Sequence, residues 1–199
     1  MNILIAGATG NTGLRLTREL AKRGHDTVAL VRESSDTVGL PKSTTQRLAD
    51  LTDLDDSVTE GCDVVIFAAG SGGGTSEEMT DKVDRDGAIR LIEIAEKTGV
   101  KRFVMLSSVG AGDPPAESDL KHYLEAKHAA DERLMASSLE YAILRPVSLT
   151  EDGPTGDVLL GDDVDPSATA TRGDVAMLLA DAAESDDWVG KVTLMQTAD

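Results

Sequence analysis

The stretch IAGATGNTGLRL, residues 5–16, decides the fold of this chain, because it carries three glycines at a regular spacing. Gly7, Gly10 and Gly13 lie three residues apart, after an apolar run that predicts a buried strand and before a pattern that predicts an amphipathic helix. A glycine-rich turn between a strand and a helix presents backbone N–H groups to an anion. The stretch therefore predicts a dinucleotide-binding turn rather than a tight turn without a ligand.

The three glycines are expected to serve different purposes. Gly7 permits the turn, Gly10 lets a pyrophosphate approach the backbone amides, and Gly13 lets the helix pack closely against the strand. Their spacing is G-x-x-G-x-x-G, whereas the usual dehydrogenase fingerprint is G-x-G-x-x-G. The turn is therefore a variant of the dinucleotide fingerprint.

The end of the second predicted strand, residues 26–31, bears on the choice of cofactor. Folds that prefer NAD place an acidic residue about 20 residues beyond the glycines, where it binds a ribose hydroxyl. Arg32 occupies that position here, and a guanidinium suits the 2′-phosphate of NADP. Glu33 follows directly, so NAD stays open as the alternative. We expect NADP to be the preferred cofactor.

Strand-like and helix-like segments alternate along the rest of the chain. Strands are predicted over residues 2–6, 26–31, 44–49, 62–69, 101–108, 139–146 and 191–198, and helices over residues 12–23, 52–61, 79–98, 117–137 and 171–185. This alternation predicts an α/β fold with a doubly wound parallel sheet of the Rossmann type, in three α/β/α layers. We expect one domain over residues 1–199, with an irregular segment at about 146–170 near the substrate side.

The charge balance disfavours several classes of partner. The chain has 36 acidic and 19 basic residues, a formal net charge of −17, so its surface repels the phosphates of nucleic acids. The acidic residues are spread along the chain rather than gathered in one tail, which favours an acidic protein adapted to high salt. No apolar run approaches the roughly 20 residues of a membrane span.

The remaining composition points to a reducing compartment and to chemistry without a metal. Cys62 is the only cysteine, so no internal disulfide can form, and we expect a cytoplasmic protein. The three histidines are scattered and show no metal-ligand spacing. A bound metal ion is therefore not expected.

Six motifs occur in order along nearly the whole chain. They are GATGNTG (7–13), RLADLTD (47–53), VVIFAAGSGG (64–73), VKRFVMLSS (100–108), YLEAK (123–127) and LEYAILRP (139–146). Together they resemble the atypical short-chain dehydrogenases/reductases, and within these the small NmrA-like and epimerase-like NAD(P)-binding proteins. The resemblance is specific for the family and much less so for an activity.

The resemblance implies a set of cofactor-binding residues. The glycines of the turn would hold the pyrophosphate and Arg32 would meet the 2′-phosphate. The other residues implied are Thr9, Asn11 and Thr12 at the turn, Asp50 and Leu51 at the adenine, Ala68, Ala69 and Gly70 along the ribose and backbone, and Pro146 and Val147 near the nicotinamide. Val147 departs from the family, which more often has glycine after the proline.

The resemblance also implies three catalytic residues. Ser108 matches the serine that orients the substrate, with Ser107 as the less favoured neighbour, and Tyr123 and Lys127 match the Y-x-x-x-K pair. Residues four apart share a helix face, and a nearby cation makes a phenol a better base. Tyr123 would exchange a proton with the substrate oxygen, while Lys127 would also bind the nicotinamide ribose. The plainer alternative is that Tyr123 only packs against its neighbours.

These observations predict an NAD(P)-dependent oxidoreductase that acts on a small carbonyl, quinone or flavin-like substrate. The alternative is a non-catalytic NAD(P)-binding redox sensor that acts through protein contacts. Epimerase or dehydratase chemistry is less favoured, because no substrate domain like that of the sugar-nucleotide members is expected. A small-molecule substrate is the expected partner, and a homodimer would form through the predicted helices at 79–98 and 117–137.

Overall fold

The computed structural model describes residues 1–72 and 74–198, and within them an 8-stranded sheet has the order β3-β2-β1-β4-β5-β6-β10-β8. The strands are β1 (Asn2–Ala6), β2 (Asp26–Val31), β3 (Thr45–Leu48), β4 (Val64–Phe67), β5 (Arg102–Leu106), β6 (Glu140–Pro146), β8 (Val158–Leu160) and β10 (Lys191–Thr197). Neighbouring strands are parallel except for β10 and β8, which are antiparallel. The order reverses at β1, which confirms the predicted doubly wound Rossmann topology.

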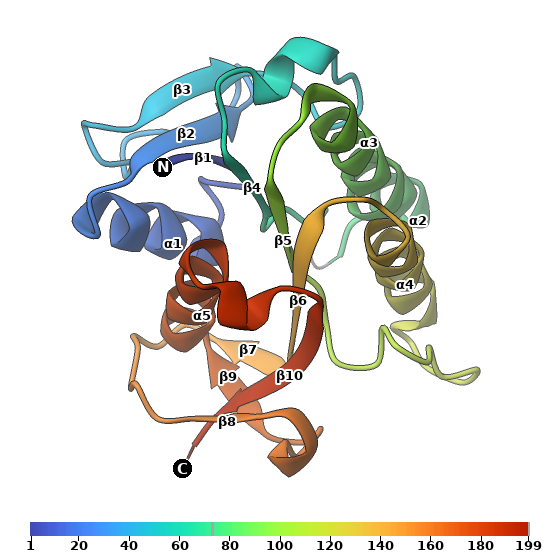
Figure 1. Cartoon of the computed structure of the whole chain (residues 1–199). Coiled ribbons are helices and arrows are strands. Elements are labelled where there is room, and N and C mark those ends of the chain that lie inside the picture. Colours follow the sequence, from blue (N-terminus) through green and yellow to red (C-terminus); the bar gives the residue numbers. More distant parts are fainter. Residues whose placement is uncertain (73, 199) are drawn as a thin grey trace.

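Helices cover both faces of this sheet, as the alternation predicted. Helices α1 (Asn11–Lys22) and α5 (Arg172–Glu184) pack side by side on one face (Figure 1). Helices α2 (Glu77–Thr80), α3 (Ala88–Thr98) and α4 (Lys121–Met135) lie on the other face. The result is a three-layer α/β/α arrangement.

The central strand β1 shows how the sheet separates two hydrophobic cores. Ile3 and Ile5 belong to the core beneath α1 and α5, whereas Leu4 and Ala6 belong to the core beneath α3 and α4. All four residues are fully buried. Side chains alternate between the two faces of a strand, so a parallel strand covered on both faces must be apolar throughout.

Local signals end α1 and α3 and begin α5 close to where the sequence predicts, whereas α4 is shorter than the predicted 117–137. The chain leaves α1 through Gly24 and α3 through Gly99, at φ angles of +86° and +78° that glycine adopts without strain. Thr171 caps the start of α5, because its side chain accepts a hydrogen bond from the backbone N–H of Asp174. The predicted helix over residues 52–61 is shorter in the structure, a single 3₁₀ turn at Asp56–Thr59.

The predicted helix over residues 79–98 is interrupted by a wider turn. Between α2 and α3 the segment Asp81–Gly87 has π-helical geometry. Gly87 lies against the backbone of the loop that follows β3, where an added Cβ would stand 3.0 Å from the carbonyl oxygen of Leu51. Such wide turns often mark functional sites, and this one carries the buried Asp84 into the interior.

The segment at 146–170 is more regular than the sequence predicts. It contains β7 (Ser148–Thr150), pairs this strand in parallel with β9 (Thr169–Thr171), and adds β8 to the edge of the main sheet. The pairing partners are distant in sequence, so local composition gives no sign of them. This segment brings Leu149 and Glu151 near the start of α1.

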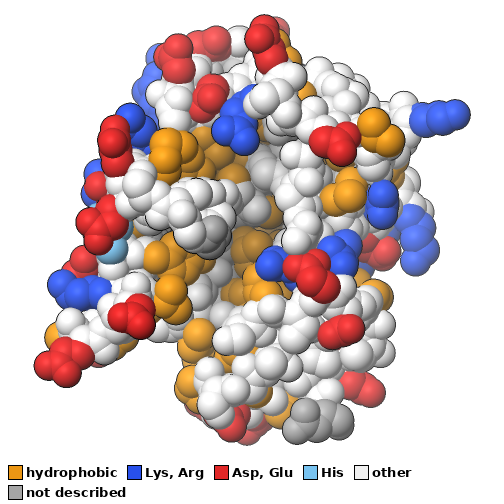
Figure 2. Space-filling view, turned by 180° about the vertical axis from the view of Figure 1, so that it is seen from behind, with side chains coloured by type: hydrophobic (Ala, Val, Ile, Leu, Met, Phe, Trp, Pro, Cys, Tyr) orange, Lys and Arg blue, Asp and Glu red, His pale blue; other side chains and the backbone are white. Residues whose placement is uncertain are grey.

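Acidic side chains are distributed over the visible surface rather than gathered in one patch (Figure 2). None of the helices in the described part of the chain has both the length and the apolar character that crossing a bilayer requires.

Candidate functional site

Two adjoining cavities lie at the carboxyl ends of the central strands, where open α/β sheets bind their ligands. We call them the large cavity, of about 690 Å³, and the small cavity, of about 230 Å³. They share a boundary formed by Gly10, Ala68, Ala69, Gly70 and Ser71. A long ligand can therefore lie across the glycine turn, with one end in each cavity.

The three glycines of the turn have distinct geometries. Gly7 has a φ of +84°, and a Cβ added there would lie 2.6 Å from the backbone of Ala69. A Cβ at Gly13 would lie 2.0 Å from the carbonyl oxygen of Gly7, so this glycine allows α1 to pack on the turn. A Cβ at Gly10 would meet only the Gly7 oxygen, at 3.3 Å, and Gly10 lines both cavities. The protein itself thus needs Gly7 and Gly13, whereas Gly10 leaves room for a ligand.

The start of α1 provides donors at the same place. Gly10 caps the helix without any side-chain hydrogen bond, and the first turn contains no acidic residue. The first N–H groups of a helix have no acceptor within it and carry a partial positive charge. Because these donors face the space left by Gly10, the residues present fit the pyrophosphate of a dinucleotide.

The small cavity collects the residues expected at the adenosine end of the cofactor. Thr9, Arg32, Asp50 and Leu51 all line it. Arg32 makes no ion pair with a carboxylate within residues 1–72 and 74–198, so its guanidinium is available to an anion. The backbone N–H and hydroxyl of Thr52 donate to Asp50 and lower its pKa, and Arg32 adds to this effect.

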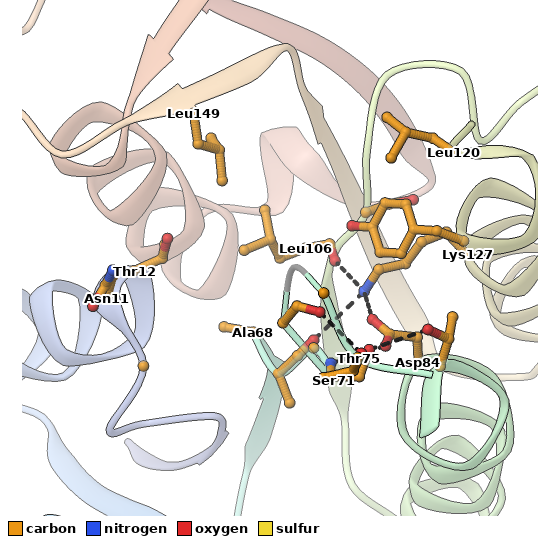
Figure 3. A pocket seen from close by; sticks show the side chains of 18 of the residues that line it. Asn11, Thr12, Ala68, Ser71, Thr75, Asp84, Leu106, Leu120, Lys127 and Leu149 are labelled. Carbon is orange, nitrogen blue, oxygen red and sulfur yellow. Dashed lines mark hydrogen bonds and ion pairs between the residues drawn. The ribbon is translucent and has the colours of Figure 1, made fainter. Parts of the chain in front are cut away.

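Tyr123 and Lys127 lie together on α4 and both line the large cavity. The Lys127 Nζ atom lies 5.7 Å from the centre of the Tyr123 ring and 3.2 Å from Asp84 Oδ1. It also donates to the backbone carbonyl of Leu106, at 3.4 Å (Figure 3). Burial opposes the charge on Lys127, but Tyr123 and Asp84 raise its pKa above the ordinary value. The ammonium group is therefore held in its charged form.

Asp84 is a site residue that sequence reasoning missed. Its carboxylate is fully buried, and Oδ2 accepts a hydrogen bond from the backbone N–H of Ser71 at 2.9 Å. It thus joins the loop after β4 to Lys127 on α4. The sequence held one sign of this role, because Asp84 is a carboxylate within a segment whose pattern predicts a helix with a buried face.

The two serines after β5 differ in their surroundings. Ser107 is buried and lines the large cavity, and its hydroxyl donates to Asp131 Oδ2 at 2.7 Å. Arg145 binds the same oxygen, while burial raises the pKa of Asp131. Ser108 is half-buried and is not part of the cavity lining. The catalytic role of Ser108 stays a prediction, and of the two serines it is Ser107 that lines the large cavity.

Other predicted residues also lie outside the cavity lining. Pro146 and Val147 are buried, and Val147 packs in the core beneath α5. Leu149, two residues further on, lines the large cavity instead. A second missed residue, Arg172 at the start of α5, lines the same cavity. The sequence predictions that do meet around the two cavities are Gly7, Thr9, Gly10, Asn11, Thr12, Arg32, Asp50, Leu51, Ala68, Ala69, Gly70, Tyr123 and Lys127.

Comparison with known proteins places this arrangement among dinucleotide-binding folds. Residues 7–186 match the model of a family described as NAD(P)H-binding. A Bacillus subtilis protein named "Uncharacterized sugar epimerase YhfK" is 38% identical over 184 residues, which cover 88% of this chain and 85% of that protein.

Two solved structures are similar over the whole chain. A putative NAD-dependent epimerase/dehydratase from Bacillus halodurans is 36% identical with a TM-score of 0.93, covering 100% of this chain and 95% of that one. The oxidoreductase ylbE from Lactococcus lactis is 32% identical with a TM-score of 0.88, covering 100% and 92%. The chain belongs to the NAD(P)H-binding family of atypical short-chain dehydrogenase/reductase proteins and has their Rossmann fold.

Proposed function

We propose that this protein is an NADP-preferring oxidoreductase that transfers hydride to or from a small carbonyl, quinone or flavin-like substrate. The observation that carries the proposal is the position of Tyr123 and Lys127 in the large cavity, which adjoins the glycine turn. A proton-transfer pair and a dinucleotide turn in one continuous space favour chemistry over binding alone.

The cofactor preference rests on the small cavity. The backbone donors at Gly10 would hold the pyrophosphate, and Arg32 would pair with a 2′-phosphate at the far end. An NAD-preferring site would place a carboxylate where Arg32 stands. Asp50 is oriented by Thr52, at the place where the adenosine would lie.

The chemistry divides between the cofactor and the chain. A bound nicotinamide cofactor supplies or accepts the hydride. Tyr123 exchanges the proton with the substrate oxygen, and the ammonium group of Lys127 lies beside its ring, 5.7 Å from the ring centre. Leu106, Leu120 and Leu149 give the large cavity apolar lining, against which the apolar part of a substrate would pack.

The names of relatives support the coarse class. The Lactococcus lactis structure is named an oxidoreductase, and the Bacillus halodurans structure is named for NAD-dependent chemistry. One name specifies NAD and the other specifies redox chemistry, so together they support a dinucleotide-dependent oxidoreductase without naming a substrate.

The test is NADPH oxidation against a panel of carbonyl compounds, quinones and flavins. Replacing Tyr123 with phenylalanine is expected to lower kcat by about 100-fold or more. Tyr141→Phe is the matched control, because Tyr141 is half-buried on β6 and lies outside both cavities. A panel without any response, or equal rates in the Tyr123→Phe variant and wild type, would overturn the proposal. The single variants Ser107→Ala and Ser108→Ala, assayed side by side, show which of the two hydroxyls contributes to kcat.

A redox sensor is the second candidate, and one feature of the site favours it. The charge of Lys127 is compensated by the buried Asp84, and the hydroxyl of Ser107 is donated to Asp131. Side chains that already pair with neighbouring carboxylates are less available to a substrate, which favours a protein that binds the dinucleotide without turning over a substrate. A sensor would bind NADP and NADPH with clearly different affinities in calorimetry, and the Tyr123→Phe variant would keep that difference.

A further inference from the structure

Arg172 reaches the cofactor site from a distant part of the sequence. It is the first residue of α5, and its side chain lines the large cavity together with Gly10, Asn11 and Thr12 at the start of α1. Two helices that are far apart in the chain therefore meet at the place where the pyrophosphate would lie. The motifs of the sequence gave no role to this arginine.

The guanidinium of Arg172 is held over the start of α1 by two contacts. Its Nη1 atom donates to Thr12 Oγ1 at 3.0 Å, and its Nε atom donates to Glu151 Oε1 at 2.8 Å. Its Nη2 atom has no hydrogen-bond partner among residues 1–72 and 74–198. One edge of the guanidinium thus remains free for a ligand, although the side chain is only 24% exposed.

The backbone around Arg172 is fixed on both sides. A Cβ at Gly173 would lie 2.1 Å from the backbone nitrogen of Pro154, so the loop before β8 packs directly on the main chain there. The Gly173 N–H also donates to the carbonyl of Asp152. On the other side, Thr171 caps the helix. These contacts position the arginine before any ligand arrives, which lowers the entropic cost of binding.

Arg172 is the basic side chain of the site that lies nearest to the glycine turn. The basic side chains that line the two cavities are Arg32, Lys127 and Arg172. Lys127 is paired with a buried carboxylate, and Arg32 lies in the small cavity rather than the large one. In a chain with a net charge of −17, an anionic pyrophosphate needs a nearby cation, and Arg172 is the one beside the turn.

We propose that Arg172 binds the pyrophosphate of the dinucleotide through the free edge of its guanidinium. Glu151 holds the arginine in place, and its Oε1 atom also accepts a hydrogen bond from Asn11. Its side chain is 60% exposed, so water can hydrogen-bond to Glu151 if the phosphate takes over one of these donors. The proposal rests on the cofactor part of the proposed function and is independent of turnover.

The experiment measures binding by calorimetry with three probes: NADPH, ADP-ribose and adenosine 2′-monophosphate. ADP-ribose carries the pyrophosphate without a 2′-phosphate, and adenosine 2′-monophosphate carries the reverse. Arg172→Gln is expected to weaken ADP-ribose and NADPH by about 10- to 100-fold, as the loss of a charged hydrogen bond predicts, and to leave adenosine 2′-monophosphate unchanged. Arg172→Lys keeps the charge without the planar fork and is expected to fall between.

Arg15→Gln is the matched control, because it removes the same charge from the same cluster. Arg15 donates to Asn11 and to the backbone of Glu151 but does not line either cavity. The proposal is overturned if Arg172→Gln binds ADP-ribose as wild type does, if Arg15→Gln loses as much, or if adenosine 2′-monophosphate weakens equally. If the wild-type protein binds none of the probes, the proposed function is overturned as well. If the wild type binds them and the Arg172→Gln substitution leaves that binding unchanged, only this inference is overturned.

Discussion

Lys127 and Asp84 form a buried ion pair, with 3.2 Å between Nζ and Oδ1 and side-chain exposures of 3% and 0%. The pair joins α4 to the π-helical turn at Asp81–Gly87 and, through the N–H of Ser71, to the loop after β4. A buried charge is costly without a partner, so each residue makes the other tolerable. The lysine at the centre of the proposed chemistry is therefore positioned by a distortion of a neighbouring helix.

The first prediction concerns this pair. Asp84→Asn removes the carboxylate and leaves a buried ammonium group without a counter-charge. We expect the free energy of unfolding to fall by about 3–5 kcal/mol, measured by urea denaturation at neutral pH. Lys127→Met, which leaves the carboxylate alone, is expected to cost a similar amount.

The double variant is the control for this prediction. Asp84→Asn with Lys127→Met removes both charges, so the loss should be smaller than the sum of the two single losses by at least about 1 kcal/mol. Additive losses would show that the two side chains do not stabilise each other.

The second prediction separates the glycines of the turn. Gly13→Ala places a Cβ 2.0 Å from a backbone oxygen, so it should lower the melting temperature strongly or prevent folding. Gly10→Ala meets only one atom, at 3.3 Å, and should fold with nearly the wild-type melting temperature while losing affinity for NADPH. Thermal denaturation and NADPH titration of both variants check this. A stable Gly10→Ala protein with unchanged affinity would show that the ligand does not lie against the turn.

The local patterns of the sequence were sufficient for the framework of the fold. The apolar runs predict β1 and β2 with the bounds that the structure has, Asn2–Ala6 and Asp26–Val31. The glycine turn, Gly24 and Gly99 predict where the helices begin and end, because these signals act over a few neighbouring residues. Most of the residues expected at the cofactor meet around the two cavities, because they lie at or just after the carboxyl ends of predicted strands, although Pro146 and Val147 do not.

What the sequence does not reveal depends on distant contacts. Asp84 and Arg172 gain their place in the site only when α4 or α1 packs beside them, and strand β8 exists only because β10 accepts it. Ser107 and Ser108 illustrate a second limit. Neighbouring residues at a strand end point in opposite directions, so a motif aligned to within one residue cannot choose between them.

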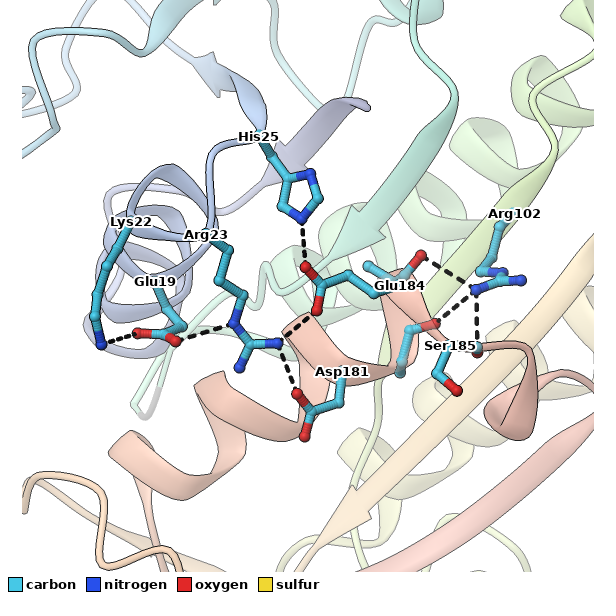
Figure 4. A network of polar contacts seen from close by, with 10 residues as sticks. Glu19, Lys22, Arg23, His25, Arg102, Asp181, Glu184 and Ser185 are labelled. Carbon is cyan, nitrogen blue, oxygen red and sulfur yellow. Dashed lines mark hydrogen bonds and ion pairs between the residues drawn. The ribbon is translucent and has the colours of Figure 1, made fainter.

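The third prediction concerns Arg102, which is buried at the end of the sheet opposite the cavities. Its guanidinium donates to backbone carbonyls at the end of α5, among them that of Ser185 (Figure 4). It also donates to the carbonyl of Ala183 and pairs with Glu140 and Asp186. Arg102→Met leaves these acceptors without a donor and should lower the free energy of unfolding by about 3–5 kcal/mol. Chemical denaturation measures this loss.

Lys101→Met is the comparison for that variant. Lys101 pairs with the same Glu140, at 3.6 Å, but its side chain is 65% exposed, and exposed pairs contribute less than about 1 kcal/mol. If Arg102→Met and Lys101→Met lower the free energy of unfolding by the same amount, burial does not determine how much the Arg102 contacts stabilise the fold.

The fourth prediction is a pH dependence caused by Asp174. Burial alone would raise the pKa of this carboxyl, but hydrogen bonds from Gly156, Thr197, Thr171 and Thr155 lower it below the ordinary value. The unfolded chain therefore binds the proton more readily than the folded chain does. The stabilisation is complete above the unfolded pKa of about 3.9 and is lost as the pH falls through the lower folded value.

Asp174→Asn tests this dependence. At pH 7 the variant should be less stable by about 2–3 kcal/mol, and the difference from wild type should shrink below about pH 4, in urea titrations at several pH values. Asp162→Asn is the control, since Asp162 is exposed and its substitution should change stability little at any pH. A difference that stays constant down to pH 3 would contradict the role of the Asp174 charge.

The last prediction follows from the net charge of −17. Repulsion among dispersed carboxylates destabilises the folded chain at low ionic strength, and salt shortens its range from about 10 Å at 0.1 M to about 3 Å at 1 M. The melting temperature should therefore rise steadily between about 0.1 M and 2 M KCl. A triple variant with asparagine at the exposed residues Asp162, Asp163 and Asp187 carries fewer negative charges and should need less salt to reach the same melting temperature. A melting temperature that does not respond to KCl would mean that the carboxylates are spaced widely enough to be harmless, and the acidic surface would then require an explanation other than adaptation to salt.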